Sequence, residues 1–287
     1  MNNCIYIFLP VHNRKNVTYR FISCLKSQTY ENYHLLLIDD GSSDGTAEMV
    51  CGHIAKLTVL KGTGDWWWTG SLQQGYNWLK ARNVSPSDMV LMINDDTEFG
   101  PDFLKTAVSL LDRNPRTLIL AQYYDRESQK AIETGITTDW RKLTFEIARS
   151  PEQINCLSTR GLFLRAGDLF ETGCFYPRLL PHYASDYEFT MRALRKGMRL
   201  MTDPALKLWY DRKTTGYRHF GNDPFWVSVR KLFSIKSVAN PFVLTVFIAL
   251  ACPWKFKLIN WLRVWKRTAA QIVTFGLTSK SEPLQRE

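Results

Sequence analysis

Continuous apolar runs alternate with amphipathic stretches along the first half of the chain. Four runs have the length and composition of strands buried on both faces: residues 4–11, 34–38, 57–61 and 88–93. Apolar residues at helical spacing predict three helices: residues 16–28, 71–82 and 185–196. We also expect Pro101 to open a helix, because its missing N–H is harmless at a helix start. The alternation predicts an α/β fold with a mostly parallel central sheet and helices on both faces.

Acidic residues follow two of the predicted strands directly. Asp39 and Asp40 come at the end of the second run, and Asp95 and Asp96 follow the fourth. In open parallel sheets, ligands bind beyond the carboxyl ends of the strands. These four acids are therefore the first candidates for chemistry.

The segment Asn94-Asp95-Asp96-Thr97 has two interpretations. Adjacent carboxylates repel each other and are costly in a core. At a strand end their oxygens suit Mg²⁺ or Mn²⁺, which would then clamp a diphosphate. Alternatively, the segment is a solvated turn that caps the next helix. Spacing alone leaves both interpretations open.

Two further acidic segments also have two interpretations, and taken alone each favours the structural one. The stretch from Asp39 to Gly45 offers carboxylate acceptors to a nucleotide base or ribose, or it is a helix-entry turn capped by Asp44. Asp186 is a candidate general base at the edge of a cleft. Alternatively, Asp186 only interacts favourably with the dipole at a helix start.

Three consecutive tryptophans lie between Gly64 and Gly70. Three neighbouring side chains cannot all face one core, so at least one of them points elsewhere. Glycines permit close backbone approach to a ligand, and indole rings suit the apolar faces of sugars. We therefore place Gly64, Trp68 and Gly70 at a ligand site, with a loop that only covers the core as the alternative.

The net charge of +10 comes from one end of the chain. Residues 1–204 carry 23 Lys and Arg against 23 Asp and Glu, whereas residues 205–287 carry 14 against 4. A neutral body with a basic tail argues against a protein wrapped in nucleic acid along its length. The acids at the strand ends would repel phosphate backbones, and no RNA-binding module sequence is visible. We therefore expect no nucleic-acid partner.

Cysteine usage and the N-terminus favour the cytoplasm. None of the six cysteines has CxxC spacing, and the first residues lack the pattern of a signal peptide. Reduced thiols are the simplest interpretation. The longest apolar run, residues 242–252, is shorter than the roughly 20 residues of a membrane-spanning helix, so we predict none.

An ordered set of motifs resembles family 2 of the glycosyltransferases, which have the GT-A fold. The motifs are PVHNR at 10–14, LKSQTY at 25–30, IDDGSSDGT at 38–46, NDD at 94–96, TRGLF at 159–163, and YASDYEF at 183–189 followed by Arg192. The resemblance covers about residues 4–210, and the order and spacing of the motifs make it specific. It implies inverting transfer from a nucleotide-diphospho-sugar donor, which is UDP-, dTDP- or GDP-linked.

The resemblance also implies a donor site. Asp39 would contact the nucleotide base. The segment with Pro10, His12 and Arg14 would line the same site, together with the glycine and tryptophan segment described above. His12 stands where relatives more often have an aromatic residue or threonine.

The metal and the base follow from two other motifs. Asp96, with Asp95 nearby, would hold Mg²⁺ or Mn²⁺ on the diphosphate. Asn94 replaces the first acid of the family's DxD motif, so Asp96 is the preferred ligand. Asp186 would take the proton from the attacking acceptor hydroxyl.

On the acceptor side the resemblance implies roles for Gly161, His182 and Tyr183. The tryptophan segment followed by NDDT resembles a bacterial subgroup that builds O-antigens, capsules and other cell-surface polysaccharides. Rhamnosyltransferases are frequent in that subgroup. The acceptor would be a glycan or a lipid-linked glycan.

The basic tail predicts an amphipathic helix. Trp254, Leu258, Trp261 and Trp265 recur at helical spacing among Lys and Arg residues. Such a helix suits an anionic membrane surface. The alternative is a helical hairpin packed on the catalytic domain, with its basic residues merely solvated.

We favour the membrane and divide the chain accordingly. Residues 1–215 form the predicted GT-A catalytic domain, and residues 216–287 form a basic helical region that associates with the membrane. The protein would then be cytoplasmic and peripheral on the inner face of the cytoplasmic membrane.

Two other classes of protein compete with this interpretation. A sugar nucleotidyltransferase would need a glycine-rich signature with a basic residue near the first strand, which Arg14-Lys15 echoes only faintly. A non-catalytic protein that binds nucleic acid or another anionic surface through the tail is disfavoured by the acids at the strand ends.

Overall fold

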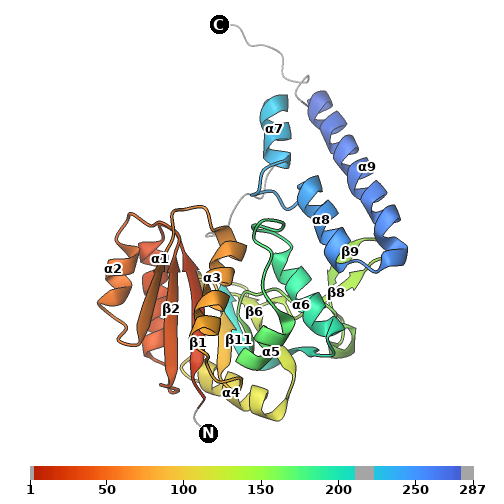
Figure 1. The fold of residues 1–287 in the computed structure, drawn as a ribbon. Helices are drawn as coiled ribbons and strands as arrows, with labels where there is room; N and C mark the ends of the chain where they lie inside the picture. Colours follow the sequence, from red (N-terminus) through yellow and green to blue (C-terminus); the bar gives the residue numbers. More distant parts are fainter. Residues whose placement is uncertain (1–2, 211–222, 279–287) are drawn as a thin grey trace, which may run out of the picture.

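The computed structural model describes residues 3–210 and 223–278. A central sheet has its strands in the order β3-β2-β1-β4-β10-β6-β11-β5, with β7 paired to β6 (Figure 1). Its strands are β1 (Ile5–Val11), β2 (Tyr33–Asp39), β3 (Leu57–Lys61), β4 (Met89–Met92), β5 (Thr97–Glu98), β6 (Thr117–Asp125), β7 (Ala131–Glu133), β10 (Leu162–Arg165) and β11 (Arg199–Tyr210). A separate hairpin consists of β8 (Ile136–Asp139) and β9 (Thr144–Ile147).

Helices cover both faces of the sheet and continue beyond it. They are α1 (Lys15–Lys26), α2 (Thr46–Cys51), α3 (Trp67–Ala81), α4 (Phe103–Arg113), α5 (Ala166–Thr172), α6 (Ser185–Arg195), α7 (Phe225–Leu232), α8 (Pro241–Ala251) and α9 (Trp254–Thr278).

The predicted parallel strands are confirmed. Strands β3, β2, β1 and β4 run parallel, and β11 runs parallel to β6. Strand β10 is antiparallel to both β4 and β6, so it joins the two parallel groups into one sheet.

Alternating residues of each strand face opposite cores. In β1, Ile7 packs with α1 and α4 on one face, whereas the neighbouring Phe8 packs with α3, α5 and α6 on the other. Both side chains are fully buried. This burial on two faces explains why the strands appear in the sequence as continuous apolar runs.

Two helices begin at other residues than predicted. Helix α3 begins at Trp67 and not at residue 71, because a distant carboxylate, described below, accepts the N–H groups at its start. Helix α4 begins at Phe103, since Pro101 lies in the turn before it and the Phe103 N–H bonds the Gly100 carbonyl.

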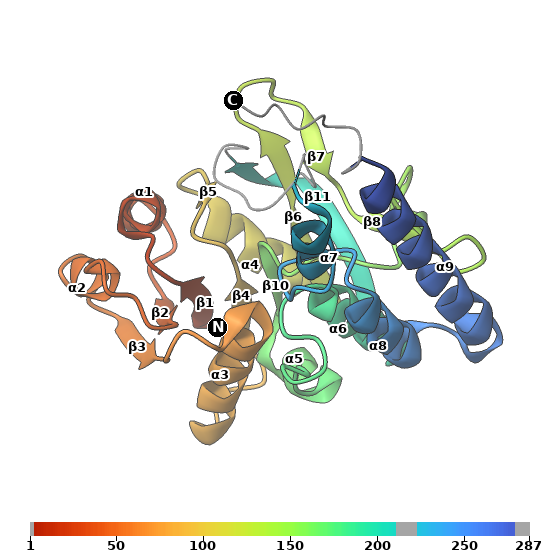
Figure 2. The same ribbon diagram turned by 90° about the horizontal axis from the view of Figure 1, so that it is seen from above.

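The C-terminal helices lie at one end of the sheet. Figure 1 shows α7, α8 and α9 rising beyond the edge at which β1 and β2 end, and Figure 2 shows α8 beside α6. Phe247 of α8 packs against Phe145 of the hairpin, and Asn260 of α9 donates to the Trp140 carbonyl at 2.9 Å. These contacts agree with the packed hairpin that the sequence left as an alternative.

Two further predictions concern this end of the chain. The predicted boundary between residues 215 and 216 lies outside the described residues. Across residues 3–210 and 223–278, every helix is too short or too polar to cross a membrane.

Candidate functional site

The acids that follow the strands meet at one edge of the sheet. Strand β1 lies between β2 and β4, and all three run parallel. Asp39 and Asp40 therefore end β2 close to where Asp95 and Asp96 follow β4. This is the arrangement that the sequence predicted for a ligand site.

Asp95 is held by helix α1. Its carboxylate accepts from the Thr18 hydroxyl at 2.9 Å and lies 3.2 Å from Nε of Arg14. Burial raises the pKa of Asp95 to about 6, although Arg14 and Thr18 oppose that rise. Both carboxylate oxygens of Asp95 thus have partners within the chain.

Asp96 has unused acceptor capacity. Its Oδ2 is buried and accepts no hydrogen bond, since Nη2 of Arg14, 3.3 Å away, lies outside hydrogen-bonding geometry. The side-chain oxygen of Asn94 is also buried without a partner. Buried oxygens that accept no hydrogen bond are costly, and a hard divalent cation takes such ligands. Asp96 and Asn94 therefore fit the metal that the fold family implies.

The chain alone offers few ligands for this cation. In the part of the chain that the structure describes, no three His, Cys, Asp or Glu side chains group as a metal site. The remaining coordination positions would have to be filled by water and by a bound diphosphate, as magnesium sites often are.

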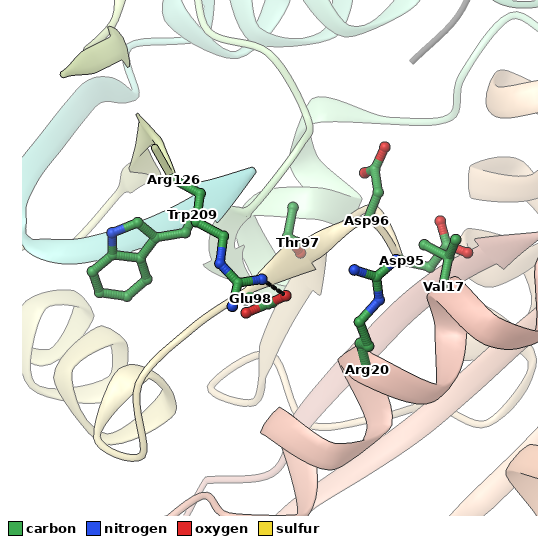
Figure 3. A pocket seen from close by; sticks show the side chains of 8 residues that line it. All are labelled: Val17, Arg20, Asp95, Asp96, Thr97, Glu98, Arg126 and Trp209. Carbon is green, nitrogen blue, oxygen red and sulfur yellow. Dashed lines mark hydrogen bonds and ion pairs between the residues drawn. The ribbon is translucent and has the colours of Figure 1, made fainter. Parts of the chain in front are cut away.

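A hollow opens beside the acid pair (Figure 3). Arg126 crosses one side of it and pairs with Glu98. The hollow is lined by Val17, Arg20, Asp95, Asp96, Thr97, Glu98, Arg126 and Trp209. Asp95 and Asp96 thus line this hollow, although both side chains are largely buried.

Asp40 organises the loop in front of the sheet, a role that sequence reasoning missed. Its carboxylate accepts from the backbone N–H groups of Gly64 at 2.8 Å, Trp66 at 2.9 Å and Trp67 at 3.1 Å. The carboxylate is buried and supplies the missing acceptors at the start of α3. The only signal in the sequence is that two acids end β2.

Asp39 keeps the position predicted for contact with a base. Its Oδ1 accepts from the Ser42 backbone N–H at 2.8 Å, which fixes the turn after β2. On the neighbouring strand, Pro10 pairs in register with Ile38, and Nδ1 of His12 lies 2.6 Å from the Asp40 carbonyl oxygen. The segments predicted to bind the donor are thus adjacent, and their role stays a prediction.

A close backbone approach explains two glycines. Gly41 and Gly64 both have positive φ, and a Cβ on Gly41 would lie 2.9 Å from the Gly64 nitrogen. Any larger residue would push the two loops apart. Gly70 lies inside α3, where a Cβ would meet Trp66 at 3.1 Å.

The three tryptophans separate as their sequence predicts. Trp66 and Trp68 pack against the core, and Nε1 of Trp68 donates to the Thr159 hydroxyl at 3.0 Å. Trp67 has φ of 54° and turns away from that core. Its ring meets His182 edge to face at 5.8 Å between centroids. Trp67 thus faces the loop before α6, and the predicted role of Trp68 at the donor site stays a prediction.

Asp186 lies in the first turn of α6. Its Oδ1 accepts from the Tyr187 backbone N–H at 2.9 Å, and the side chain is partly exposed. Burial raises the pKa of Asp186 to about 6 against the opposing effects of that hydrogen bond and of Arg160. A carboxylate with a raised pKa is better suited to accept a proton at neutral pH.

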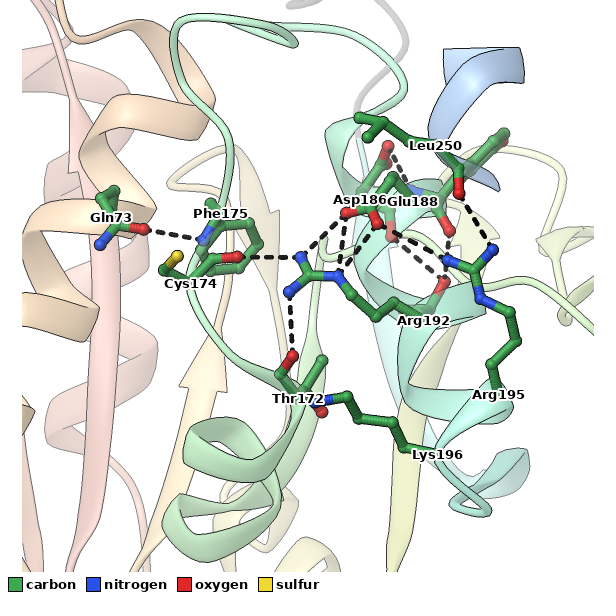
Figure 4. Close-up of polar contacts among 12 residues, drawn as sticks. Gln73, Thr172, Cys174, Phe175, Asp186, Glu188, Arg192, Arg195, Lys196 and Leu250 are labelled. Carbon is green, nitrogen blue, oxygen red and sulfur yellow. Dashed lines mark hydrogen bonds and ion pairs between the residues drawn. The ribbon is translucent and has the colours of Figure 1, made fainter. Parts of the chain in front are cut away.

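A buried ion pair fixes α6 in place (Figure 4). Glu188, two residues after Asp186 on α6, accepts from Nε of Arg192 at 3.0 Å and from its Nη2 at 2.9 Å. Arg192 also donates to the carbonyls of Thr172 and Cys174, both at 2.9 Å. These bonds attach α6 to the segment after α5, and so position Asp186.

An arginine and a glutamate beside Asp186 were not singled out from the sequence. Nη2 of Arg160 lies 3.6 Å from Oε2 of Glu133, and the Arg160 side chain is 42% exposed. Burial raises the pKa of Tyr123; Arg160 opposes the rise, and Asp96 and Glu133 add to it. Arg160 also lowers the pKa of Asp186, and Glu133 raises it. The pair is therefore within electrostatic range of the base candidate, and Tyr123 lies within range of both this pair and Asp96.

Two of the predicted acceptor-side residues, His182 and Tyr183, lie in the loop directly before α6. The rings of His182 and Tyr183 are 4.5 Å apart, and Nδ1 of His182 is buried without a hydrogen-bond partner. Burial lowers the pKa of His182, so its ring is neutral near pH 7. Gly161 has φ of 90°, and a Cβ there would overlap the Leu208 side chain. Their roles toward an acceptor stay predictions.

Two family models and one known sequence that match this chain are all described as glycosyltransferases. The family described as "Glycosyl transferase family 2" matches residues 6–170, and "Glycosyl transferase family group 2" matches residues 89–254. A protein of Haemophilus influenzae described as "Uncharacterized glycosyltransferase" is 23% identical over 241 residues, which is 78% of this chain and 72% of that protein.

Solved structures show the same fold. The structure of S. aureus TarS 1–349 in complex with UDP-GlcNAc has a TM-score of 0.58 at 14% identity, and covers 97% of this chain and 91% of its own. GalNAc-T7 with UDP, GalNAc and Mn²⁺ has a TM-score of 0.61 at 13% identity and covers 95% of this chain. This chain spans 57% of the GalNAc-T7 chain. The likeness confirms the predicted GT-A fold.

Proposed function

The chain belongs to glycosyl transferase family 2, and from this premise we propose that it transfers a sugar with inversion from a nucleotide-diphospho-sugar to a glycan hydroxyl. The donor is UDP-, dTDP- or GDP-linked. Its diphosphate binds at Asp96 with Mg²⁺ or Mn²⁺. That cation offsets the charge that develops on the leaving group.

One observation carries the proposal. Asp186 is a carboxylate of raised pKa, and both Arg160 and Glu133 lie within electrostatic range of it. In a direct displacement, one group must take the acceptor proton on the face opposite the leaving diphosphate. The arrangement of Asp186 and Asp96 provides one group for each task. Neighbours solved with UDP, UDP-GlcNAc or Mn²⁺ support a nucleotide-sugar donor and a divalent cation.

The biological role is proposed from the sequence resemblance. The tryptophan segment followed by NDDT is typical of enzymes that build O-antigens, capsules and other cell-surface polysaccharides. We assign this chain to that group, with a rhamnosyl or other hexosyl donor. Its acceptor is a glycan or a lipid-linked glycan.

A donor panel tests the reaction class. We expect the purified protein with Mn²⁺ to release nucleoside diphosphate slowly from one of UDP-GlcNAc, UDP-glucose, dTDP-rhamnose and GDP-mannose, and to leave the others intact. The measurement is chromatography of the nucleotide products. Formation of a nucleotide sugar and inorganic diphosphate from a nucleoside triphosphate and a sugar 1-phosphate would instead indicate a nucleotidyltransferase. That result would overturn the proposal.

We further propose that the C-terminal helices bind the inner face of the cytoplasmic membrane. Trp254 is 85% exposed and Leu258 is 69% exposed on the outer side of α9, and Trp226 of α7 is 76% exposed. Basic residues lie among them on the same helix, including Lys255 and Lys257. Exposed aromatic anchors beside cations match the interface of an anionic bilayer.

A double variant tests this surface. We expect Trp254→Glu with Leu258→Glu to weaken binding to phosphatidylglycerol-containing vesicles by about 10-fold or more, because burial of each side chain stabilises by about 1.5–3 kcal/mol. Co-sedimentation measures the binding. Tyr19→Glu is the control, since Tyr19 is an exposed aromatic residue on the catalytic body. Equal sedimentation of the double variant and the wild type would contradict the proposal.

A further inference from the structure

Trp67 is the point at which three distant segments meet. Its N–H bonds Asp40 at the start of α3, and its ring contacts His182 in the loop before α6. The ammonium of Lys236, from the segment between α7 and α8, lies 5.5 Å from the centre of the same ring. The C-terminal region thus reaches the candidate active site through one cation.

Two polar groups lie beside Trp67, one buried and one exposed. Nδ1 of His182 is buried and has no hydrogen-bond partner. Lys236 is exposed, forms no ion pair with the described residues, and has its ammonium over the face of Trp67. Burial lowers the pKa of His182 and Lys236 lowers it further, so the imidazole is neutral beside the ammonium. An ammonium and a neutral imidazole together offer donors to an anionic oxygen.

The surface around Lys236 is apolar. On the same segment Ile235 and Val238 are exposed, and so is Phe242 at the start of α8. A ligand whose anionic group binds Lys236 would therefore lay an adjoining hydrocarbon chain on these side chains. The site suits an amphiphile with a charged head and an apolar tail.

We propose that Lys236 and His182, beside Trp67, form a subsite for the phosphate that joins an acceptor glycan to its lipid. This subsite deepens the proposed function and rests on it for the identity of the acceptor. The glycan would extend from the phosphate toward Asp186, and the lipid toward Ile235, Val238 and Phe242. The phosphate of a bulk lipid headgroup has the same chemistry, so the experiment must separate the two sources.

The test measures binding of farnesyl phosphate, farnesol and inorganic phosphate by calorimetry in EDTA, so that no metal draws phosphate to Asp96. We expect the wild type to bind farnesyl phosphate more tightly than it binds farnesol or inorganic phosphate. Lys236→Gln should weaken farnesyl phosphate binding by about 10-fold, as loss of a charged hydrogen bond does, and should leave farnesol binding unchanged. Lys236→Arg keeps the charge and should restore the affinity.

Lys105→Gln is the matched control, because Lys105 is an exposed lysine on α4, which packs on the opposite face of the sheet from α3. An equal loss in this control would show general attraction to a basic surface and overturn the subsite. An unchanged affinity of Lys236→Gln for farnesyl phosphate would also overturn the subsite. Loss of binding to phosphatidylglycerol vesicles as large as the loss for farnesyl phosphate would assign the phosphate to a headgroup instead. Because no donor is present, failure of this subsite is distinguishable from failure of the donor panel.

Discussion

Replacement of Asp186 by Asn is expected to slow glycosyl transfer by about 10²–10⁴-fold and to leave donor binding unchanged. The amide has nearly the shape of the carboxylate, and its oxygen can still accept the Tyr187 N–H that fixes the side chain. It cannot take a proton from the acceptor hydroxyl. The loss therefore falls on the chemical step.

The pH dependence gives this prediction a second readout. Burial raises the pKa of Asp186 to about 6, and only the ionised carboxylate can act as base. Transfer should therefore reach a plateau well above pH 6, fall to half of it near pH 6, and decline further below. Burial also raises the pKa of Asp95 to about 6, so an acid limb in the wild type alone does not identify Asp186. If the residual activity of Asp186→Asn no longer falls at low pH, the fall in the wild type is due to Asp186.

Initial rates across pH and donor affinity by calorimetry measure both effects. Asp112→Asn serves as the control, because Asp112 is an exposed acid whose partner, Arg165, lies away from the described site. A near-normal rate in Asp186→Asn would show that another group takes the proton. Loss of donor binding in the same variant would show that Asp186 holds the substrate instead.

The sequence predicts those parts of the fold that depend on local pattern. Residues buried on both faces leave continuous apolar runs, which is why the first four strands and the acids that follow them could be located. The helix that begins at Trp254 could be predicted because its aromatic residues repeat at helical spacing. The family resemblance then indicates which strand ends carry the chemistry.

Contacts between distant segments could not be predicted in this way. Helix α3 begins early because Asp40, 26 residues before Trp66, accepts its first N–H groups. No local propensity reports such an acceptor. The pairing of Glu133 with Arg160 likewise depends on how the second half of the sheet folds. Such contacts decide the electrostatics of the site, so the charges around Asp186 become visible only in three dimensions.

Removal of divalent metal is expected to reduce transfer by about 10²–10³-fold, because Lewis-acid stabilisation of a leaving diphosphate contributes several kcal/mol. EDTA should abolish turnover of the donor selected by the panel, and Mn²⁺ or Mg²⁺ should restore it. Asp96→Asn should raise the Mn²⁺ concentration needed for half-maximal activity by about 10-fold or more. Asp96 has an unused buried oxygen, and the variant weakens that ligand.

The variant Asp95→Asn tests whether Asp95 is itself a metal ligand or only positions the loop that carries Asp96. Both oxygens of Asp95 already contact Thr18 and Arg14, so this variant should lower the melting temperature while its Mn²⁺ requirement changes less than that of Asp96→Asn. Direct titration of Mn²⁺ by electron paramagnetic resonance gives the metal affinity without turnover. Full transfer in EDTA would overturn the metal assignment. The positive charge opposite the diphosphate would then have to come from Arg14, whose guanidinium already lies 3.3 Å from Asp96.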